Sequence, residues 1–437
     1  MHGIPRHQAS QSPIAPACRI VLAVCLSILG WWHTLAGAAT FTVNSTNDVN
    51  DLTPGNGLCV AYLIIFPPFV LPFCTLRGAI EEANALPGPD RIIVPAGLYP
   101  LALSGTDDTA RNGDLDITDT LFLSGTGAKE TIIDGGGLDR IFDLSKSASE
   151  VYISGMTIKN GSLPAGLSGD EAGGGGIRNQ ARLTLIDLNL QDNAALDDAG
   201  GGLLNRAACT LQATTVARNR AVMGGGIANR PGGTLLLQTS TVRDNGSEAG
   251  GGLFNEGRVT VVNSTFSGNR AQESALATGG GLLNYGFLDL LQSTVAANQA
   301  SIPGGGISNK GILRLANTLV ADNVNGDCDR TRAPLSLGHN LDSDASCRLS
   351  ATGDLSGVDP RIDGLGPHGG PTDTHGLLLG SPAVDRGRDL RAEGVATDQR
   401  GITRPQGLAY DIGAFETGPR SLVPLIMPLL PGQGTAQ

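Results

Sequence analysis

Gly200-Gly201-Gly202-Leu203-Leu204-Asn205 is one of six copies of a Gly-Gly-Gly-[Ile/Leu]-x-Asn motif in the chain. The motif asparagines are 26, 24, 26, 29 and 25 positions apart, and a period in this range is typical of a solenoid. Each glycine in such a run costs a helix about 1 kcal/mol relative to alanine. A tight corner between short strands, in contrast, needs the conformational freedom of glycine. The repeat therefore predicts stacked strands and excludes a helical solenoid.

A second motif, which also ends in asparagine, alternates with the first. Ten and eight residues before its asparagine stand apolar residues such as Leu183 and Leu185, and three residues before it stands another, such as Leu190. An i, i+2 repeat is the periodicity of a strand with one buried face. Each turn is thus expected to contain three short strands: one after the glycines, a Leu-x-Leu strand and a Ser/Thr-x-Val strand. Such turns predict an all-β fold, a right-handed parallel β-helix similar to that of pectin lyases.

The two asparagine columns have a structural interpretation. An inward asparagine at a corner can hydrogen-bond its equivalents one turn above and one turn below, so that no buried amide is left unpaired. We therefore expect two ladders that hold the turns together and bind no ligand. The first consists of Asn179, Asn205, Asn229, Asn255, Asn284 and Asn309, and the second of Asn193, Asn219, Asn245, Asn269, Asn298 and Asn323.

The first 38 residues have the pattern of a secretory signal peptide. Arg6 and Arg19 precede the apolar run 20–32, and Ala36-Gly37-Ala38 offers a cleavage site. The apolar run is short for a bilayer span, so no membrane-spanning segment is expected in the mature chain. A lipoprotein cut before Cys25 is the alternative. Export would place the protein at the surface, in the periplasm or outside a bacterium.

Charge agrees with export and excludes some partners. The formal net charge is −11, and without residues 1–38 the chain has 28 basic against 41 acidic residues, or −13. A chain of this charge is not expected to bind nucleic acid or an anionic membrane through electrostatics.

The cysteines outside the signal peptide form two close pairs and one single residue. In an exported chain, Cys59/Cys74 and Cys328/Cys347 are predicted disulfides. Cys209 occupies a position that holds Leu or Val in the other turns, so we expect a buried thiol.

Residues 74–84, CTLRGAIEEAN, have a helical pattern with Leu76, Ile80 and Ala83 on one face. Such a helix can cover the open end of the rod. The segment resembles the CSLREA domain, which begins exported bacterial β-helix proteins. Gly78 replaces a glutamate of that family, and the apolar insert 63–73 lengthens the interval after the first cysteine of the pair.

Beyond residue 323 the repeat stops. The motifs at 337–342, 369–372, 380–385, 397–401 and 411–416 (LGHNLD, GGPT, GSPAVD, TDQRG and DIGAFE) follow one another in the order of the choice-of-anchor Q domain, which they resemble. That domain is a C-terminal region of bacterial surface β-helix proteins. The resemblance implies surface display and supplies no catalytic residues.

These observations divide the chain into five parts. They are a signal peptide (1–38), a CSLREA-like cap (39–90), the parallel β-helix (91–323), a choice-of-anchor Q-like region (324–416) and an unstructured tail (417–437) with no recognisable anchor.

One acidic run invites a metal interpretation. Asp107, Asp108, Asp114 and Asp116 are calcium candidates, because hard cations take several oxygen ligands. The alternative is a strand in which Leu115 and its neighbours alternate with aspartates that face water. If the aspartates only face water, no cofactor is expected, and calcium is the alternative.

The outward positions of the repeated strands are mostly threonine and gather no acids. Asp289 and Arg314 are expected to form a surface ion pair. The threonines in line from Thr215 to Thr294 could face an ordered surface such as ice, although threonine is also a good strand former. We expect a cell-surface or secreted structural, adhesin-like protein without catalytic activity. The alternative is a polysaccharide lyase or glycoside hydrolase acting on acidic polysaccharide, a fold-level analogy.

Length variation is concentrated at one corner of the repeat. From the second-motif asparagine to the next motif Ile or Leu the spacing is 10, 8, 8, 13 and 9 residues, and it is 17 from Asn160. Stacking puts these insertions on one edge, where solenoids often bind partners. Segments 162–172, 194–199 and 271–278 are therefore expected to project and to contact a glycan or a surface protein. Neutral surface insertions are the alternative.

Overall fold

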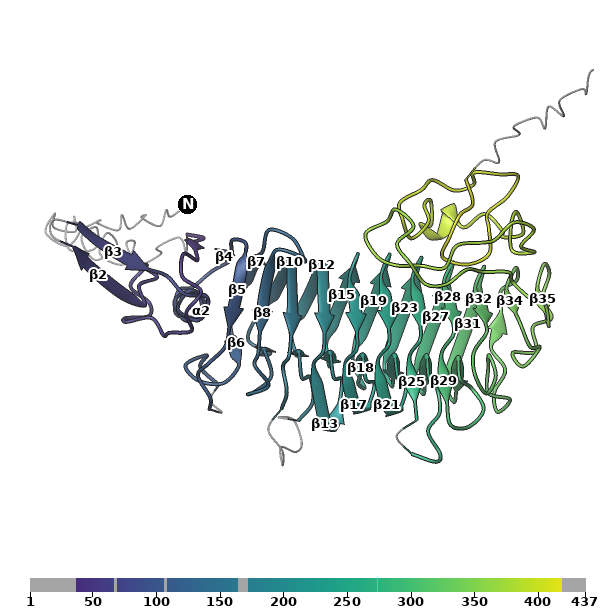
Figure 1. Cartoon of the computed structure of the whole chain (residues 1–437), viewed down its shortest axis with the longest axis horizontal. Coiled ribbons are helices and arrows are strands. Elements are labelled where there is room, and N and C mark those ends of the chain that lie inside the picture. Colours follow the sequence, from purple (N-terminus) through teal and green to yellow (C-terminus); the bar gives the residue numbers. More distant parts are fainter. Residues whose placement is uncertain (1–36, 67–68, 106–107, 164–171, 273, 419–437) are drawn as a thin grey trace, which may run out of the picture.

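In the computed structural model, the chain forms a parallel β-helix with its C-terminal region folded back along one side (Figure 1). The structure describes residues 37–66, 69–105, 108–163, 172–272 and 274–418. Residues 1–36 of the predicted signal peptide and residues 419–437 of the tail lie outside this part. Apart from one hairpin, formed by β2 (Tyr62–Phe66) and β3 (Phe69–Phe73), the named strands pair in parallel.

Twenty strands make the long sheet, which contains the Leu-x-Leu and Ser/Thr-x-Val strands. Its members are β1 (Thr40–Thr42), β4 (Asp90–Ile93), β5 (Gly97–Pro100), β7 (Leu121–Ser124), β8 (Thr131–Asp134), β10 (Glu150–Lys159), β12 (Arg182–Gln191), β15 (Ala208–Gln212), β16 (Thr215–Ala217), β19 (Thr234–Gln238), β20 (Thr241–Arg243), β23 (Arg258–Val262), β24 (Thr265–Ser267), β27 (Phe287–Leu291), β28 (Thr294–Ala296), β31 (Ile312–Ala316), β32 (Leu319–Ala321), β33 (Leu335–Ser336), β34 (Leu341–Asp342) and β35 (Leu355–Ser356).

Eight strands make the glycine-motif sheet, which follows the Gly-Gly-Gly corners. They are β6 (Leu115–Ile117), β9 (Phe142–Leu144), β11 (Ile177–Asn179), β14 (Leu203–Asn205), β18 (Ile227–Asn229), β22 (Leu253–Asn255), β26 (Leu282–Asn284) and β30 (Ile307–Asn309). The glycines are needed because the turns approach closely at this corner. Gly200 has a φ of +71°, and a Cβ on Gly201 would lie 2.3 Å from the backbone oxygen of Arg220.

The three expected strands are present in the repeated turns, and the structure adds two features. In β10 and β12 the Leu-x-Leu and Ser/Thr-x-Val strands are continuous, and a fourth strand follows the second ladder in five turns. These fourth strands form the edge sheet, which consists of β13 (Ala194–Ala199), β17 (Arg220–Met223), β21 (Gly246–Ala249), β25 (Arg270–Ala271) and β29 (Gln299–Ala300). The backbone there stays extended and pairs with its equivalent one turn away, so that 194–199 is a strand and not a projecting loop.

Non-glycine residues with positive φ bend each turn of the long sheet. Six residues before the second-ladder asparagines the φ angles lie between +46° and +53°, and the residues are Asp187, Ala213, Thr239, Asn263, Gln292 and Asn317. This left-handed backbone is uncommon outside glycine. The varied residue types show why the bend gave no signal in the sequence.

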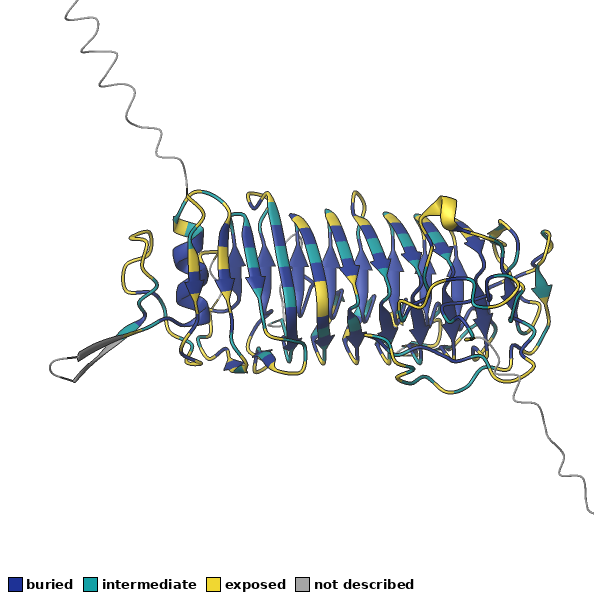
Figure 2. Ribbon diagram, turned by 90° about the horizontal axis from the view of Figure 1, so that it is seen from above, coloured by how far each residue is buried: buried dark blue, intermediate teal, exposed yellow. Residues whose placement is uncertain are grey.

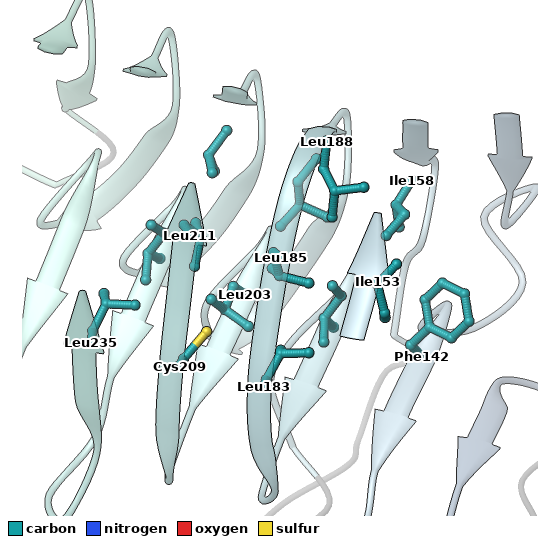
Figure 3. Close-up of a cluster of buried hydrophobic side chains, with 14 of the residues drawn as sticks. Phe142, Ile153, Ile158, Leu183, Leu185, Leu188, Leu203, Cys209, Leu211 and Leu235 are labelled. Atoms are coloured by element: carbon teal, nitrogen blue, oxygen red, sulfur yellow. The ribbon is translucent and has the colours of Figure 1, made fainter. Parts of the chain in front are cut away.

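One continuous core runs from Phe41 to Leu349. The register stacks Leu183, Cys209 and Leu235 directly above one another, as the motif alignment predicts. Cys209 is unpaired and 4% exposed, and its sulfur lies among leucines (Figure 3). Seen from above, buried residues alternate along the strands of the long sheet with residues of intermediate burial, and exposed residues lie mainly at strand ends (Figure 2).

Both asparagine columns form continuous hydrogen-bonded ladders. In the first ladder, every Nδ2 except that of the last member, Asn309, donates to the Oδ1 one turn on, at 2.7 to 2.9 Å. The second ladder repeats this at 2.9 to 3.0 Å. Its last member, Asn323, donates to a carboxylate oxygen of Asp327 at 2.8 Å, so an acceptor-only group ends the column.

The N-terminal end of the rod is covered as predicted. Helix α2 (Leu76–Ala85) begins after Thr75, whose Oγ1 accepts a hydrogen bond from the Gly78 amide at 3.0 Å. Leu76 and Ile80 join the core. Both predicted disulfides, Cys59–Cys74 and Cys328–Cys347, are present.

The β-helix extends further than the predicted boundary at residue 323, because β33, β34 and β35 continue the long sheet. Residues 359–416 then form a lobe on the outward side of this sheet, with one short 3-10 helix, η2 (Arg391–Glu393), and its chain lies beside β19 to β34 in Figure 1. Among the described residues, no helix is long and apolar enough to cross a membrane.

The lobe covers most of the threonine column. Thr265 Oγ1 donates to Gln399 Oε1 at 2.7 Å, and the Ala414 amide donates to Thr294 Oγ1 at 3.0 Å. Thr241, Thr265 and Thr294 are buried, and Thr215 is half-buried. The idea that these threonines face an ordered external surface is therefore wrong, because the chain's own C-terminal region occupies that face.

Candidate functional site

Acidic and arginine side chains meet on the outward side of the glycine-motif sheet, in its N-terminal turns. Asp114, Asp116 and Asp143 each present a carboxylate oxygen, and these atoms lie within 4.8 Å of one another. Arg140 Nε is 3.3 Å from Asp114 Oδ2, and its Nη1 is 3.3 Å from Asp143 Oδ2. Arg178 Nε donates to Asp143 Oδ1 at 2.9 Å. We call these five residues the acid–arginine cluster.

Parallel register brings the cluster together. The middle residues of β6, β9 and β11 point outward, and pairing places Asp116, Asp143 and Arg178 in one column. The segment before β6 is held by Arg77 of helix α2, whose Nη1 donates to the backbone oxygen of Ala110 at 2.7 Å. The cap helix thus positions the acidic run.

Burial sets the electrostatics of the cluster. It raises the pKa of Asp114 well above its usual range, an effect that the nearby Arg140 opposes and the Asp116 carboxylate strengthens. Burial likewise raises the pKa of the adjacent Asp139. Among the described residues, Asp139 and the three aspartates of the cluster lie beside two arginines, Arg140 and Arg178, in a place that is poorly solvated.

The four calcium candidates differ in their position and burial. Asp107 lies outside the described residues, and Asp108 is exposed. Asp114 directly precedes the predicted strand, β6, and Asp116 is its middle residue. Their exposed fractions are only 7% and 5%. The expectation that they face water is wrong, because the outward side of this sheet is covered.

Asp143 and the two arginines of the cluster were not predicted as site residues. The repeat motif is degenerate before residue 160, so the alignment of Arg140 and Asp143 with the later turns was not visible. Arg178 lies in an intact motif, but its acidic partner was not known. Phe142-Asp143-Leu144 pairs in register with Ile177-Arg178-Asn179, and only this pairing identifies Asp143 as an outward residue. Chemically, three carboxylates beside arginine are the groups that acid–base catalysis uses, but their side chains are largely inaccessible here.

A shallow hollow of about 440 Å³ lies on the outward face of the long sheet. Its lining includes Glu150, Tyr152, Arg182, Thr184 and Leu236. It extends over the turns from β10 to β23, and none of the lobe residues lines it. On the last two of these turns the lobe contacts the neighbouring strands β20 and β24, at Thr241 and Thr265.

A second hollow, of about 460 Å³, is lined by Asp198, Arg206, Arg230, Pro231 and Glu256. Arg230 bridges its two acids, with nitrogen–oxygen distances of 3.1 Å to both Asp198 and Glu256. The two acids and two arginines are partly solvated and their charges cancel, so the hollow has no net charge that would attract a charged ligand.

The described residues of the three segments predicted to project lie along the edge sheet, to which β13 and β25 belong (Figure 1). We call this side of the rod the contact edge. Isolated bridges pair Ser162 with Ala194 and Ala249 with Thr278 in the parallel sense of the edge sheet. Residues 164–171 and 273 lie outside the described residues. Within this contact edge, Leu196 on β13 is 63% exposed and Leu276 on the loop after β25 is 77% exposed.

The surface ion pair between Asp289 and Arg314 is present, with Nε donating to Oδ1 at 2.6 Å. Of the histidines, His375 is buried between the lobe and the long sheet. Its Nε2 is 2.9 Å from Ser267 Oγ, and its Nδ1 is 2.7 Å from the backbone oxygen of Asp363. It links two parts of the fold.

The strand pairings define the class of this protein, an all-β parallel β-solenoid. No protein-family model matches the chain, and no curated protein matches it in sequence. Among solved structures, pectate lyase Pel9A is similar to it, with 13% sequence identity and a TM-score of 0.44, over 87% of this chain and 98% of that chain. At this identity the likeness concerns the fold alone.

Proposed function

We propose that this protein is an exported, non-catalytic β-helix that acts as a structural and adhesive rod at, or released from, a bacterial surface. The observation that carries the proposal is the contact edge, on which Leu196 and Leu276 are exposed to solvent although the core is complete without them. The CSLREA-like and choice-of-anchor Q-like sequence motifs support surface display, and two disulfides are consistent with an extracellular location.

The spacing of the two leucines suits a protein partner. They lie three turns apart, which corresponds to about 14 Å at the usual separation of strands. Covering a leucine side chain contributes about 1.5–3 kcal/mol, so two such anchors on one edge can supply much of a weak interface.

We propose that no cofactor is required. Two guanidinium groups already contact the carboxylates of the acid–arginine cluster, with Arg140 3.3 Å from Asp114 and from Asp143. A calcium ion would need six to eight oxygen ligands, and it would compete with these cations for the same carboxylates. Calcium remains the alternative cofactor, and equilibrium dialysis with 45Ca would detect it.

Adhesion of coated beads tests the function. Beads carrying the full chain are added to bacterial and epithelial cell layers, and the double variant Leu196→Ser/Leu276→Ser is compared with Leu379→Ser/Leu408→Ser. The second pair is 81% and 96% exposed but lies on the lobe. We expect adhesion by the wild type and by the lobe variant, and a loss of adhesion in the edge variant. Equal adhesion of all three would refute the role of the contact edge.

The acid–arginine cluster favours one alternative, a lyase or hydrolase acting on acidic polysaccharide. Three carboxylates within 4.8 Å of one another, beside Arg178, could perform acid–base chemistry if the site opened. Incubation with polygalacturonate or alginate, with and without calcium, would decide. A steady release of unsaturated or reducing ends that Asp143→Asn abolishes would replace the adhesive proposal with the enzymatic one.

A further inference from the structure

The hollow on the long sheet arises from the order of side chains in one outward column. Pairing stacks Phe122, Tyr152, Thr184, Thr210 and Leu236 on five successive turns. Two small threonines thus separate two large side chains. Tyr152 and Leu236 are three turns, or about 14 Å, apart at the usual strand spacing, which leaves a recess floored by the threonines.

Tyr152 forms one end wall of the recess and is held in place. Its ring stacks on Phe122 of the preceding turn, with centroids 4.8 Å apart and an interplanar angle of 7°. Its hydroxyl donates to Glu150 Oε1 at 2.9 Å. Since Phe122 covers one face of the ring, the opposite face points along the rod toward Thr184. An aromatic face that is already oriented loses little conformational freedom when a ligand stacks on it.

The rim of the recess is polar and has no net charge. Glu150 and Arg182 stand on neighbouring turns at one side, Thr234 belongs to the same outward column, and Thr184 and Thr210 form the floor. The lining therefore combines a flat apolar wall with several groups that can donate or accept hydrogen bonds.

We propose that this recess binds a pyranose ring of a neutral glycan, with one C–H face of the sugar on Tyr152 and its hydroxyls at the polar rim. A sugar ring is the ligand whose faces are apolar while its edge carries hydroxyls. The shallow recess suits a residue within a chain, because compact sites for small molecules bury 70–90% of their ligand. The charge of −13 outside the signal peptide disfavours an anionic glycan or nucleic acid.

This site is independent of the contact edge. The recess lies on the long sheet, whereas Leu196 and Leu276 belong to the segments of the edge sheet. Glycan binding and adhesion through the leucines can therefore be lost separately.

Titration calorimetry of the full chain tests the proposal. The probes are cellohexaose, mannohexaose, xylohexaose and galactohexaose, with hexagalacturonate as the acidic comparison. Tyr152→Ala removes the stacking wall, Tyr152→Phe keeps it, and Thr184→Trp fills the recess. Tyr285→Ala is the control, because Tyr285 is a tyrosine with an accessible ring, 54% exposed, that lies outside the recess. Circular dichroism establishes that each variant is folded.

We expect at least one neutral hexasaccharide to bind. Tyr152→Ala should weaken its binding at least tenfold, which corresponds to about 1.4 kcal/mol. The affinity of Tyr152→Phe should remain within about threefold of the wild type, because a phenylalanine ring can stack on the sugar without the hydroxyl. Thr184→Trp should abolish binding, and Tyr285→Ala should not change it. The proposal is overturned if no neutral probe binds, if only hexagalacturonate binds, or if Tyr152→Ala binds as the wild type does.

Discussion

Replacing Asn255 by alanine should destabilise the rod strongly, because this residue lies inside a ladder. Its Nδ2 donates to Asn284 Oδ1 at 2.8 Å and to the backbone oxygen of Phe287 at 3.1 Å. Its Oδ1 accepts from Asn229 Nδ2 at 2.9 Å and from the Gly257 amide at 3.0 Å. At about 1 kcal/mol for each lost hydrogen bond, the free energy of unfolding should fall by about 4 kcal/mol.

The same substitution at Asn309 is the control, since both asparagines are buried and lose the same atoms. Asn309 ends the ladder: its Oδ1 accepts from Asn284 Nδ2 at 2.9 Å, and its Nδ2 donates to the backbone oxygen of Arg332 at 3.3 Å. We expect Asn309→Ala to cost about 2 kcal/mol. The packing loss is matched, so the difference isolates the hydrogen bonds.

Guanidinium denaturation followed by far-ultraviolet circular dichroism measures both free energies. The denaturant dependence should be the same in both variants, because the surface exposed on unfolding is the same. Equal destabilisation by the two substitutions, or a loss of under about 1 kcal/mol at Asn255, would refute the view that ladder hydrogen bonds stabilise the rod.

Three further predictions concern the lobe and the core. Burial lowers the pKa of His375 below its ordinary value, so the unfolded state binds the proton more readily. The lobe should therefore dock less stably as the pH falls below about 6.5, and limited proteolysis of the lobe should become faster. His375→Gln should remove this pH dependence. If the variant keeps the pH profile of the wild type, His375 is not the group responsible. Thr265→Val leaves Gln399 Oε1 without its 2.7 Å donor and should cost about 1–3 kcal/mol in urea unfolding, whereas a neutral effect would show that the lobe contact is not stabilising. Burial raises the pKa of the Cys209 thiol, so iodoacetamide should modify it only after unfolding, and rapid labelling of the folded chain would contradict its burial.

The structures that repeat or that are local in the chain could be predicted from the sequence. A Leu, Val or Cys at a constant distance before each second-ladder asparagine defines an inward position, and stacking makes every such position a neighbour of its equivalent. The same periodicity predicted the buried Cys209, and the short spacing between cysteines, together with the expectation of export, predicted both disulfides. Helix α2 followed from the period of apolar residues between Leu76 and Ala83.

The candidate sites depend on contacts between residues that the sequence repeat does not relate to one another. Asp143 and Arg178 meet through parallel register across 35 positions of the chain, and the motif is degenerate in the turn that contains Asp143. Thr265 and Gln399 are 134 positions apart, and their hydrogen bond shows that the lobe folds back over the rod. A sequence pattern specifies which side of a strand a residue takes, since side chains alternate along the backbone. What covers that outward side is decided by distant segments, and only the tertiary structure brings those segments to it.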